Sequence, residues 1–117
     1  MSKPELEFHH PAGPWTAPPG AGPGVVEQVL AEDERGEHRT TLVRWEPGTD
    51  TTAQGVARHA VWEEVYVLEG ALYDVSLDET FGKGTYACRP PDMVHGPWTA
   101  PDGVTMLVVT YPEPRPS

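Results

Sequence analysis

The chain has 117 residues, a length typical of one domain that can bury a hydrophobic core. Eight basic against eighteen acidic residues give a formal charge of −10, and no two basic residues are adjacent, which argues against nucleic-acid binding. The apolar runs are far shorter than the roughly 20 residues that span a bilayer, and the first residues lack the pattern of a signal peptide. We therefore expect a cytoplasmic protein with no nucleic-acid or membrane partner.

Residues 1–24 are predicted to form an extended arm. Six prolines among several glycines disfavour both helices and strand ladders in this segment. The folded domain is expected to cover residues 25–111, and residues 112–117 are expected to form a frayed tail.

Short β-type runs make up the folded domain. They are VVEQVL at 25–30, HRTTLVRW at 38–45, VWEEVYVL at 61–68, ALYDVSL at 71–77, GTYACR at 84–89 and VTMLVVTY at 104–111. Residues typical of turns separate them, including Glu69 and Gly70 between the third and fourth runs. No segment has the pattern of a helix, so the sequence predicts an all-β sandwich or closed barrel.

The run at 61–68 contains two adjacent glutamates. Strand alternation places Glu63 on the face of Val65 and Val67, and Glu64 on the face of Tyr66 and Leu68. Because both faces carry apolar residues, we expect the strand to be buried on both sides. A carboxylate on such a face costs several kcal/mol unless it is paired or bound to a cation.

Candidate metal ligands lie close to this strand. His59 and Glu63 stand four residues apart at its start, and His95 follows the turn-forming segment 90–94. Imidazole and carboxylate together suit Fe, Mn, Ni or Zn. The spacing alone fits equally well a buried histidine and carboxylate that only satisfy each other.

Two motifs in the chain resemble those of the cupin superfamily. In the first cupin motif, two histidines separated by one residue precede a glutamate, and a glycine follows the glutamate after six intervening residues. His59, Glu63 and Gly70 fit the second histidine, the glutamate and the glycine of this motif. In the second motif, Gly84, Pro90 and His95 match the expected glycine, proline and histidine. Asp92 stands in place of a second glycine, and Thr99 in place of an asparagine. The resemblance covers roughly residues 40–111 and implies a jelly-roll β-barrel, the double-stranded β-helix.

The segments EEVYVLEG at 63–70 and RPPDMVHGPW at 89–98 are similar to particular small cupins. These are diketone- and dihydroxyacetophenone-cleaving dioxygenases, small polyketide cyclases and the zinc-binding cupin module of some anti-sigma factors. The resemblance implies one divalent metal ion, Fe(II) or Zn(II), with Mn and Ni as alternatives. It also implies a homodimer.

One departure from the first motif concerns the ligand set. The first histidine should fall at position 57, which is Ala57. The remaining two imidazoles and one carboxylate resemble the facial triad of non-haem Fe(II) oxygenases, but the same loss fits a weakened or absent metal site. Gln54, or His9 or His10 of the arm, is a candidate for an additional ligand.

Three further residues are candidates for catalytic roles. Tyr66 and Trp98 would line a pocket for an aromatic or carbonyl substrate, and Arg89 would hold a substrate carboxylate or enolate in its guanidinium fork. Core packing explains the two aromatic residues equally well, and pairing with surface acids explains the arginine. The lone cysteine, Cys88, is expected to be core filler.

The sequence thus favours a metal-dependent cupin enzyme acting on a small carbonyl, phenolic or polyketide-like molecule through a metal-stabilised enolate. Fe(II) would support C–C cleavage by O₂, as in a dioxygenase, and Zn(II) would support cyclisation or isomerisation. The alternative from another class is a non-catalytic module that senses a ligand or metal.

Overall fold

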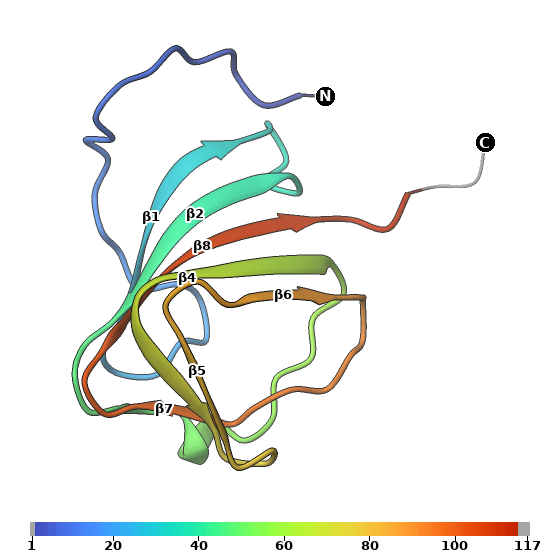
Figure 1. The fold of residues 1–117 in the computed structure, drawn as a ribbon. Coiled ribbons are helices and arrows are strands. Elements are labelled where there is room, and N and C mark those ends of the chain that lie inside the picture. The colour runs from blue at the N-terminus through green and yellow to red at the C-terminus, as the bar shows by residue number, and fades with distance from the viewer. Residues whose placement is uncertain (1, 115–117) are drawn as a thin grey trace.

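The computed structural model describes residues 2–114 and is built almost wholly of strands (Figure 1). The strands are β1 (Val25–Glu32), β2 (Arg39–Trp45), β3 (Thr49–Asp50), β4 (Trp62–Asp74), β5 (Glu79–Gly82), β6 (Tyr86–Arg89), β7 (Trp98–Ala100) and β8 (Val104–Tyr111). Within this described part of the chain the helical content is one 3-10 turn, Thr52–Gln54, and none of it is a helix that could cross a membrane. The predicted all-β class is confirmed.

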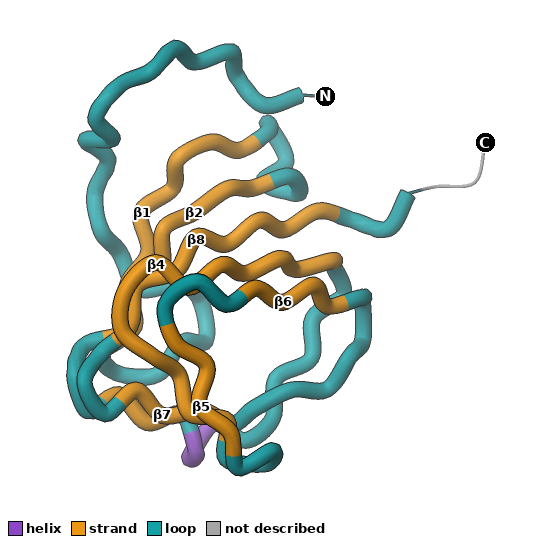
Figure 2. The backbone as a smooth tube through the Cα atoms, in the orientation of Figure 1, coloured by secondary structure: helices purple, strands orange, loops and turns teal. Residues whose placement is uncertain are grey.

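The strands form one curled antiparallel sheet in the order β1-β2-β8-β4-β7-β3, with β5 and β6 also paired to β4. The central strand β4 is long enough to belong to both halves of the barrel. Its first part pairs with β6 and β8, and its last residues pair with β5 and β7. Figure 2 shows this strand bending as it passes from one half to the other. The expected cupin barrel is therefore present.

The bend in β4 corrects one expectation, because no turn separates residues 61–68 from residues 71–77. The pairing with β8 shifts register between Val67 and Glu69, and Gly70 follows with φ +77°. A Cβ atom on Gly70 would lie 2.2 Å from the carbonyl oxygen of Gly103. A bulge with a glycine thus bends the strand without ending it, and the strand continues to Asp74.

The core lies on the inner face of the curled sheet. Its buried apolar residues are Val25, Trp45, Val65, Val67, Leu72, Ala100, Val104 and Met106. The outer face of β4 is not buried, since Tyr66 there is 44% exposed. The expectation that this strand is covered on both sides is therefore wrong. Cys88 is also exposed, because it pairs with Glu64 on the outer face, so it does not fill the core.

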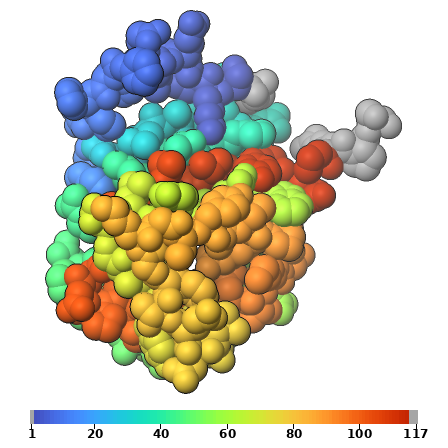
Figure 3. Space-filling view, in the orientation of Figure 1, coloured from blue at the N-terminus to red at the C-terminus, as the bar shows by residue number. Residues whose placement is uncertain are grey.

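The N-terminal arm lies along the outer wall formed by β1 and β2 (Figure 3). It forms a single bridge to β1, between Thr16 and Glu27. The Gln28 side chain donates to the Gly13 carbonyl oxygen at 2.9 Å, and the Arg44 guanidinium lies 4.3 Å from the centre of the Trp15 ring. At the other end, β8 ends at Tyr111; residues 115–117 of the predicted tail lie outside the described residues.

Candidate metal centre

His59, Glu63 and His95 come together at one end of the barrel. Each offers one ligand atom, and the three atoms all lie within 4.8 Å of one another. Nε2 of His59 is 3.8 Å from Oε2 of Glu63, and Nε2 of His95 is 3.8 Å from Oε1 of the same carboxylate. The structure therefore brings together the three ligands that the two motifs predict, as a group that could bind a metal ion.

Backbone hydrogen bonds join the two loops that carry the histidines. Ala57 and His95 form an antiparallel bridge, in which each N–H donates to the other's carbonyl oxygen, at 2.7 and 3.0 Å. The Asp92 N–H donates to the His59 carbonyl oxygen at 2.7 Å. These bonds hold the two loops that carry the histidines side by side, independently of any ion.

Asp92 explains how the second motif tolerates a missing glycine. Its φ is +65°, in the left-handed region that favours glycine. Aspartate is one of the few other residues that adopts this conformation at a modest cost. The loop before His95 therefore keeps the backbone that the motif's glycine would give.

His95 is the most buried of the three ligands, with 8% exposure. Its Nδ1 lies 3.1 Å from the Met93 carbonyl oxygen, and donation to that oxygen leaves a lone pair on Nε2. Burial, with the nearby Arg89 guanidinium, lowers the pKa of His95 and favours the neutral ring. Nε2 is buried without a hydrogen-bond partner, an unfavourable arrangement that a bound cation would relieve.

Glu63, rather than Glu64, points into the barrel. It shares the inner face with Val65, as strand alternation predicts, and its side chain is 17% exposed. Glu64 lies on the outer face, where it accepts hydrogen bonds from the hydroxyls of Tyr86 and Tyr111, and these bonds lower its pKa. The inward carboxylate is thus the one available to a metal ion.

Arg89 pairs with Glu63 across the sheet. The two residues are directly opposite each other on β6 and β4, and Nη1 of Arg89 donates to Oε1 of Glu63 at 2.9 Å. From the sequence, Glu63 was expected as a metal ligand and Arg89 as a residue that binds substrate, and the pair between them was not expected. Their pairing depends on the register of β4 with β6, which the sequence alone does not fix.

A cavity of about 370 Å³ adjoins the triad on the side of His95. Arg89, His95 and Trp98 contribute to its wall, together with apolar residues that include Leu72, Phe81 and Met93. The Trp98 ring centre lies 5.0 Å from that of His95 and 5.2 Å from the Arg89 guanidinium carbon. Its Nε1 is buried and has no hydrogen-bond partner. The cavity is thus mainly apolar, and Arg89 and His95 are among the polar groups of its wall.

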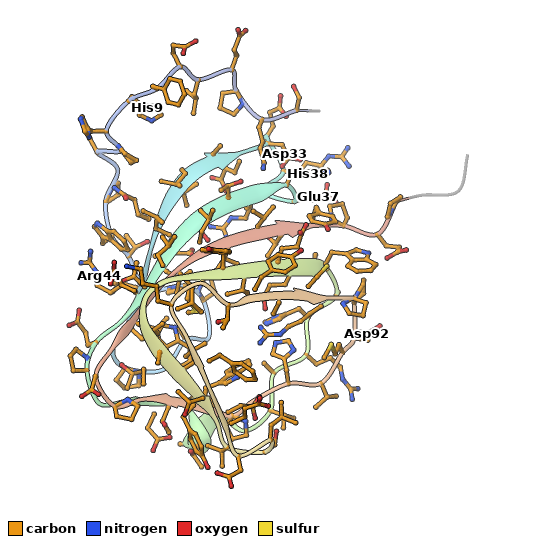
Figure 4. All side chains as sticks on the ribbon, in the orientation of Figure 1. His9, Asp33, Glu37, His38, Arg44 and Asp92 are labelled. Carbon is orange, nitrogen blue, oxygen red and sulfur yellow. The ribbon has the colours of Figure 1, made fainter. Side chains whose placement is uncertain are left out.

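Other predicted site residues lie elsewhere. Tyr66 is on the outer face of β4 and does not line this cavity. Gln54 is exposed on the 3-10 turn, with its amide against Gly22 of the arm. In Figure 4, His9 lies on the arm beyond β1, far from Asp92 in the loop that leads to His95. The described structure therefore supplies no additional ligand from these residues.

Asp74, at the end of β4, is buried at 4% exposure. Its Oδ1 accepts hydrogen bonds from the Ser76 hydroxyl at 2.8 Å and the Leu77 N–H at 3.1 Å. The carboxylate therefore organises the turn after β4. A serine two residues after an aspartate at a strand end was the signal for this role.

Comparisons with known proteins agree with this architecture. Among solved structures, an RmlC-like cupin from Shewanella frigidimarina superposes with a TM-score of 0.73 at 19% identity, covering 97% of this chain and 96% of its own. An acetylacetone dioxygenase from Acinetobacter johnsonii gives a TM-score of 0.69 at 16% identity, covering 97% of this chain and 79% of its own. At these identities the likeness shows the fold.

A third structure is that of Rhodobacter sphaeroides SigE in complex with the anti-sigma ChrR. The match has a TM-score of 0.62 at 23% identity and covers 84% of this chain and 49% of that one. A search of curated proteins found no match. The family model of the ChrR cupin-like domain matches residues 6–113. Since this match spans nearly the whole sequence, the chain belongs to the family of ChrR cupin-like domains.

Proposed function

We propose that this protein is a metal-dependent cupin enzyme that acts on a small carbonyl or phenolic molecule as its enolate. The observation that carries the proposal is the buried, unpartnered Nε2 of His95, which lies beside Glu63 at the wall of a cavity. A purely structural histidine would be expected to have a hydrogen-bond partner there.

His59, Glu63 and His95 would hold one divalent ion, Fe(II) or Zn(II), with Mn and Ni as alternatives. When bound, the ion supplies a Lewis acid that stabilises negative charge on substrate oxygens and, as Fe(II), redox chemistry toward O₂. The three ligands differ in exposure, from the His59 side chain at 46% to the His95 side chain at 6%. The site is thus open to solvent on one side and faces the cavity on the other.

The cavity residues would bind and orient the substrate. The apolar wall excludes water from the substrate body, and the Arg89 guanidinium offers donors to an anionic oxygen. The Trp98 ring closes the same wall between His95 and Arg89. The likeness to an acetylacetone dioxygenase supports a dioxygenase, and cyclisation or isomerisation with Zn(II) is the variant of the same enolate chemistry.

The family match favours one alternative from another class. The ChrR cupin-like domain takes its name from ChrR, which is described as an anti-sigma factor in its complex with SigE. A module that binds a metal or ligand without turnover would use the same triad. Cytoplasmic location and a homodimer stay predictions under either function.

The test begins with metal analysis of protein purified without oxygen. We expect about one ion per chain in the native protein and in the control His9→Ala, which changes an exposed arm residue, but little in His95→Ala. A metal at a hundred times its dissociation constant should stabilise the native protein by about 2.7 kcal/mol and His95→Ala hardly at all. The proposed site is wrong if the native protein has no stoichiometric metal, or if His95→Ala binds it equally well.

Turnover then separates the two classes of function. With Fe(II) bound, we expect oxygen uptake on addition of a 1,3-diketone or a phenolic ketone, and loss of that uptake in His95→Ala. Conversion without oxygen uptake in the Zn(II) form would identify the cyclase or isomerase. Tight metal binding with no turnover of either substrate class would favour the sensory module.

A further inference from the structure

Arg89 and the metal site use the same carboxylate oxygen. Oε1 of Glu63 accepts the Nη1 hydrogen bond of Arg89 at 2.9 Å and also faces Nε2 of His95 at 3.8 Å. Both side chains of the ion pair are only 17% exposed. The guanidinium therefore lies beside the position where the triad would hold a cation, and solvent screens the two charges from each other only partly.

The charges at this site do not balance once a metal is bound. Without metal, the negative charge of Glu63 and the permanent positive charge of Arg89 cancel. A divalent ion with two neutral imidazoles would leave an excess of two positive charges. The other acid on the cavity wall, Asp74, already accepts two hydrogen bonds from the turn after β4. The metal group itself contains one carboxylate, that of Glu63, and this carboxylate is already paired with Arg89.

We infer that Arg89 makes tight metal binding depend on an anionic ligand in the cavity. The inference rests on the proposed metal site. The guanidinium repels the incoming cation and occupies Oε1, so it weakens metal binding while the cavity holds no anion. An anionic ligand that contacts both the metal and the guanidinium removes this penalty, so metal and ligand each strengthen the binding of the other.

The same geometry defines the class of ligand. The ligand needs a delocalised anionic oxygen group, a carboxylate or an enolate, at the end that meets Arg89 and the triad. It also needs a small apolar body, because the rest of the 370 Å³ cavity is lined largely by residues such as Leu72, Phe81 and Met93. The Trp98 ring, 5.2 Å from the guanidinium carbon, holds Arg89 at the cavity wall. Arg89 is therefore a specificity-determining residue for compact anions with an apolar body.

The experiment measures Zn(II) affinity by competition with a chelating dye, with and without saturating benzoate. Benzoate is the probe because it carries the carboxylate and an apolar ring, and Zn(II) avoids redox chemistry. In the native protein we expect benzoate to raise the Zn(II) affinity by about tenfold or more, equivalent to about 1.4 kcal/mol. By reciprocity, Zn(II) should raise the affinity for benzoate by the same factor.

Arg89→Gln should reverse this pattern. Without benzoate its Zn(II) affinity should exceed that of the native protein, and the effect of benzoate should nearly vanish. Arg89→Lys keeps the charge and should retain part of the coupling. Arg44→Gln is the matched control, because it removes the same charge from the outer wall (Figure 4) and should behave as the native protein does.

Two failures are distinguishable. If the native protein does not bind Zn(II), the proposed metal site itself is wrong. If it binds Zn(II) with no effect of benzoate, or if Arg89→Gln keeps the native affinity and coupling, the metal site stands and the role of Arg89 is overturned. The reciprocal measurement on the native protein needs no variant, so the inference stays testable even if Arg89→Gln fails to fold.

Discussion

Replacing Gly70 by alanine should be far more damaging than the small change in side chain suggests. Two costs add at this position. Gly70 has φ +77°, where an L-residue loses about 1–2 kcal/mol. The new Cβ would also lie 2.2 Å from the Gly103 carbonyl oxygen and 2.9 Å from Cα of Val104. Both contacts are with backbone, so no side-chain rotation relieves them, and overpacking of this kind costs about 1–3 kcal/mol. We expect a total loss of about 2–5 kcal/mol.

Gly48 provides the control for this prediction. Its φ is +85°, and a Cβ there would meet nothing within 4 Å. Gly48→Ala should therefore lose only the conformational part, about 1–2 kcal/mol. Urea unfolding followed by tryptophan fluorescence gives both free energies of unfolding. Equal losses in the two variants would refute the claim that close contact between β4 and the start of β8 requires glycine at position 70.

Three further predictions concern the site and its surroundings. Ala57→His should raise the Zn(II) affinity about tenfold or more, because it adds an imidazole beside His95. An unchanged affinity, measured by competition with a chelating dye, would show that position 57 does not face the triad. Asp92→Gly should be at least as stable as the native protein in thermal unfolding. Asp92→Ala should lower the free energy of unfolding by about 1 kcal/mol, because φ at this position is +65°. The reverse order of stability would contradict the left-handed backbone. The hydrogen bond from His38 lowers the pKa of Asp33 from 3.8 to about 2, so the bond stabilises the fold above pH 3.8 and is lost as the pH falls toward 2. Urea unfolding across this range should show Asp33→Asn approaching the native stability as the pH falls, and a constant difference would disprove the linkage.

Residue periodicity and turn chemistry predicted the class of the fold and most of its strands. The runs at 25–30, 38–45 and 104–111 fall within or overlap β1, β2 and β8. The short strands β3, β5 and β7 were missed. Each has only two to four residues, and a segment of that length carries too little alternation to be separated from a turn. Their pairing is decided by the barrel that surrounds them.

The faces of β4 show where pattern and environment separate. Alternation correctly placed Glu63 on the same face as Val65, because the pleat fixes which residues share a face. It could not decide whether the other face is covered. That depends on which elements pack outside the strand, and the exposed Tyr66 shows that the outer face is accessible to solvent. The same limit explains why Tyr66 was expected in the pocket.

The triad was predictable because its members lie in two motifs, whereas its ion pair was not. Arg89 reaches Glu63 only through the register of β4 with β6, and register depends on the whole sheet. Residue by residue, the sequence offered Arg89 two roles, binding a substrate anion or pairing with a surface acid, and neither is the pair with Glu63. The pairing matters because it adds a permanent charge to the candidate metal site.

Ala57 replaces the first histidine of the first cupin motif, and the backbone around this position still pairs with His95. The bridge between Ala57 and His95 holds position 57 beside the triad, as a fourth ligand at that position would require. A structural metal site is closed by protein ligands, whereas a catalytic site keeps positions open for substrate. In the proposed site, a bound cation would relieve the buried Nε2 of His95, which has no hydrogen-bond partner and lies 3.8 Å from Glu63. The missing histidine therefore favours an open site with exchangeable ligands, and the Arg89 guanidinium beside it favours an anion as the ligand that enters.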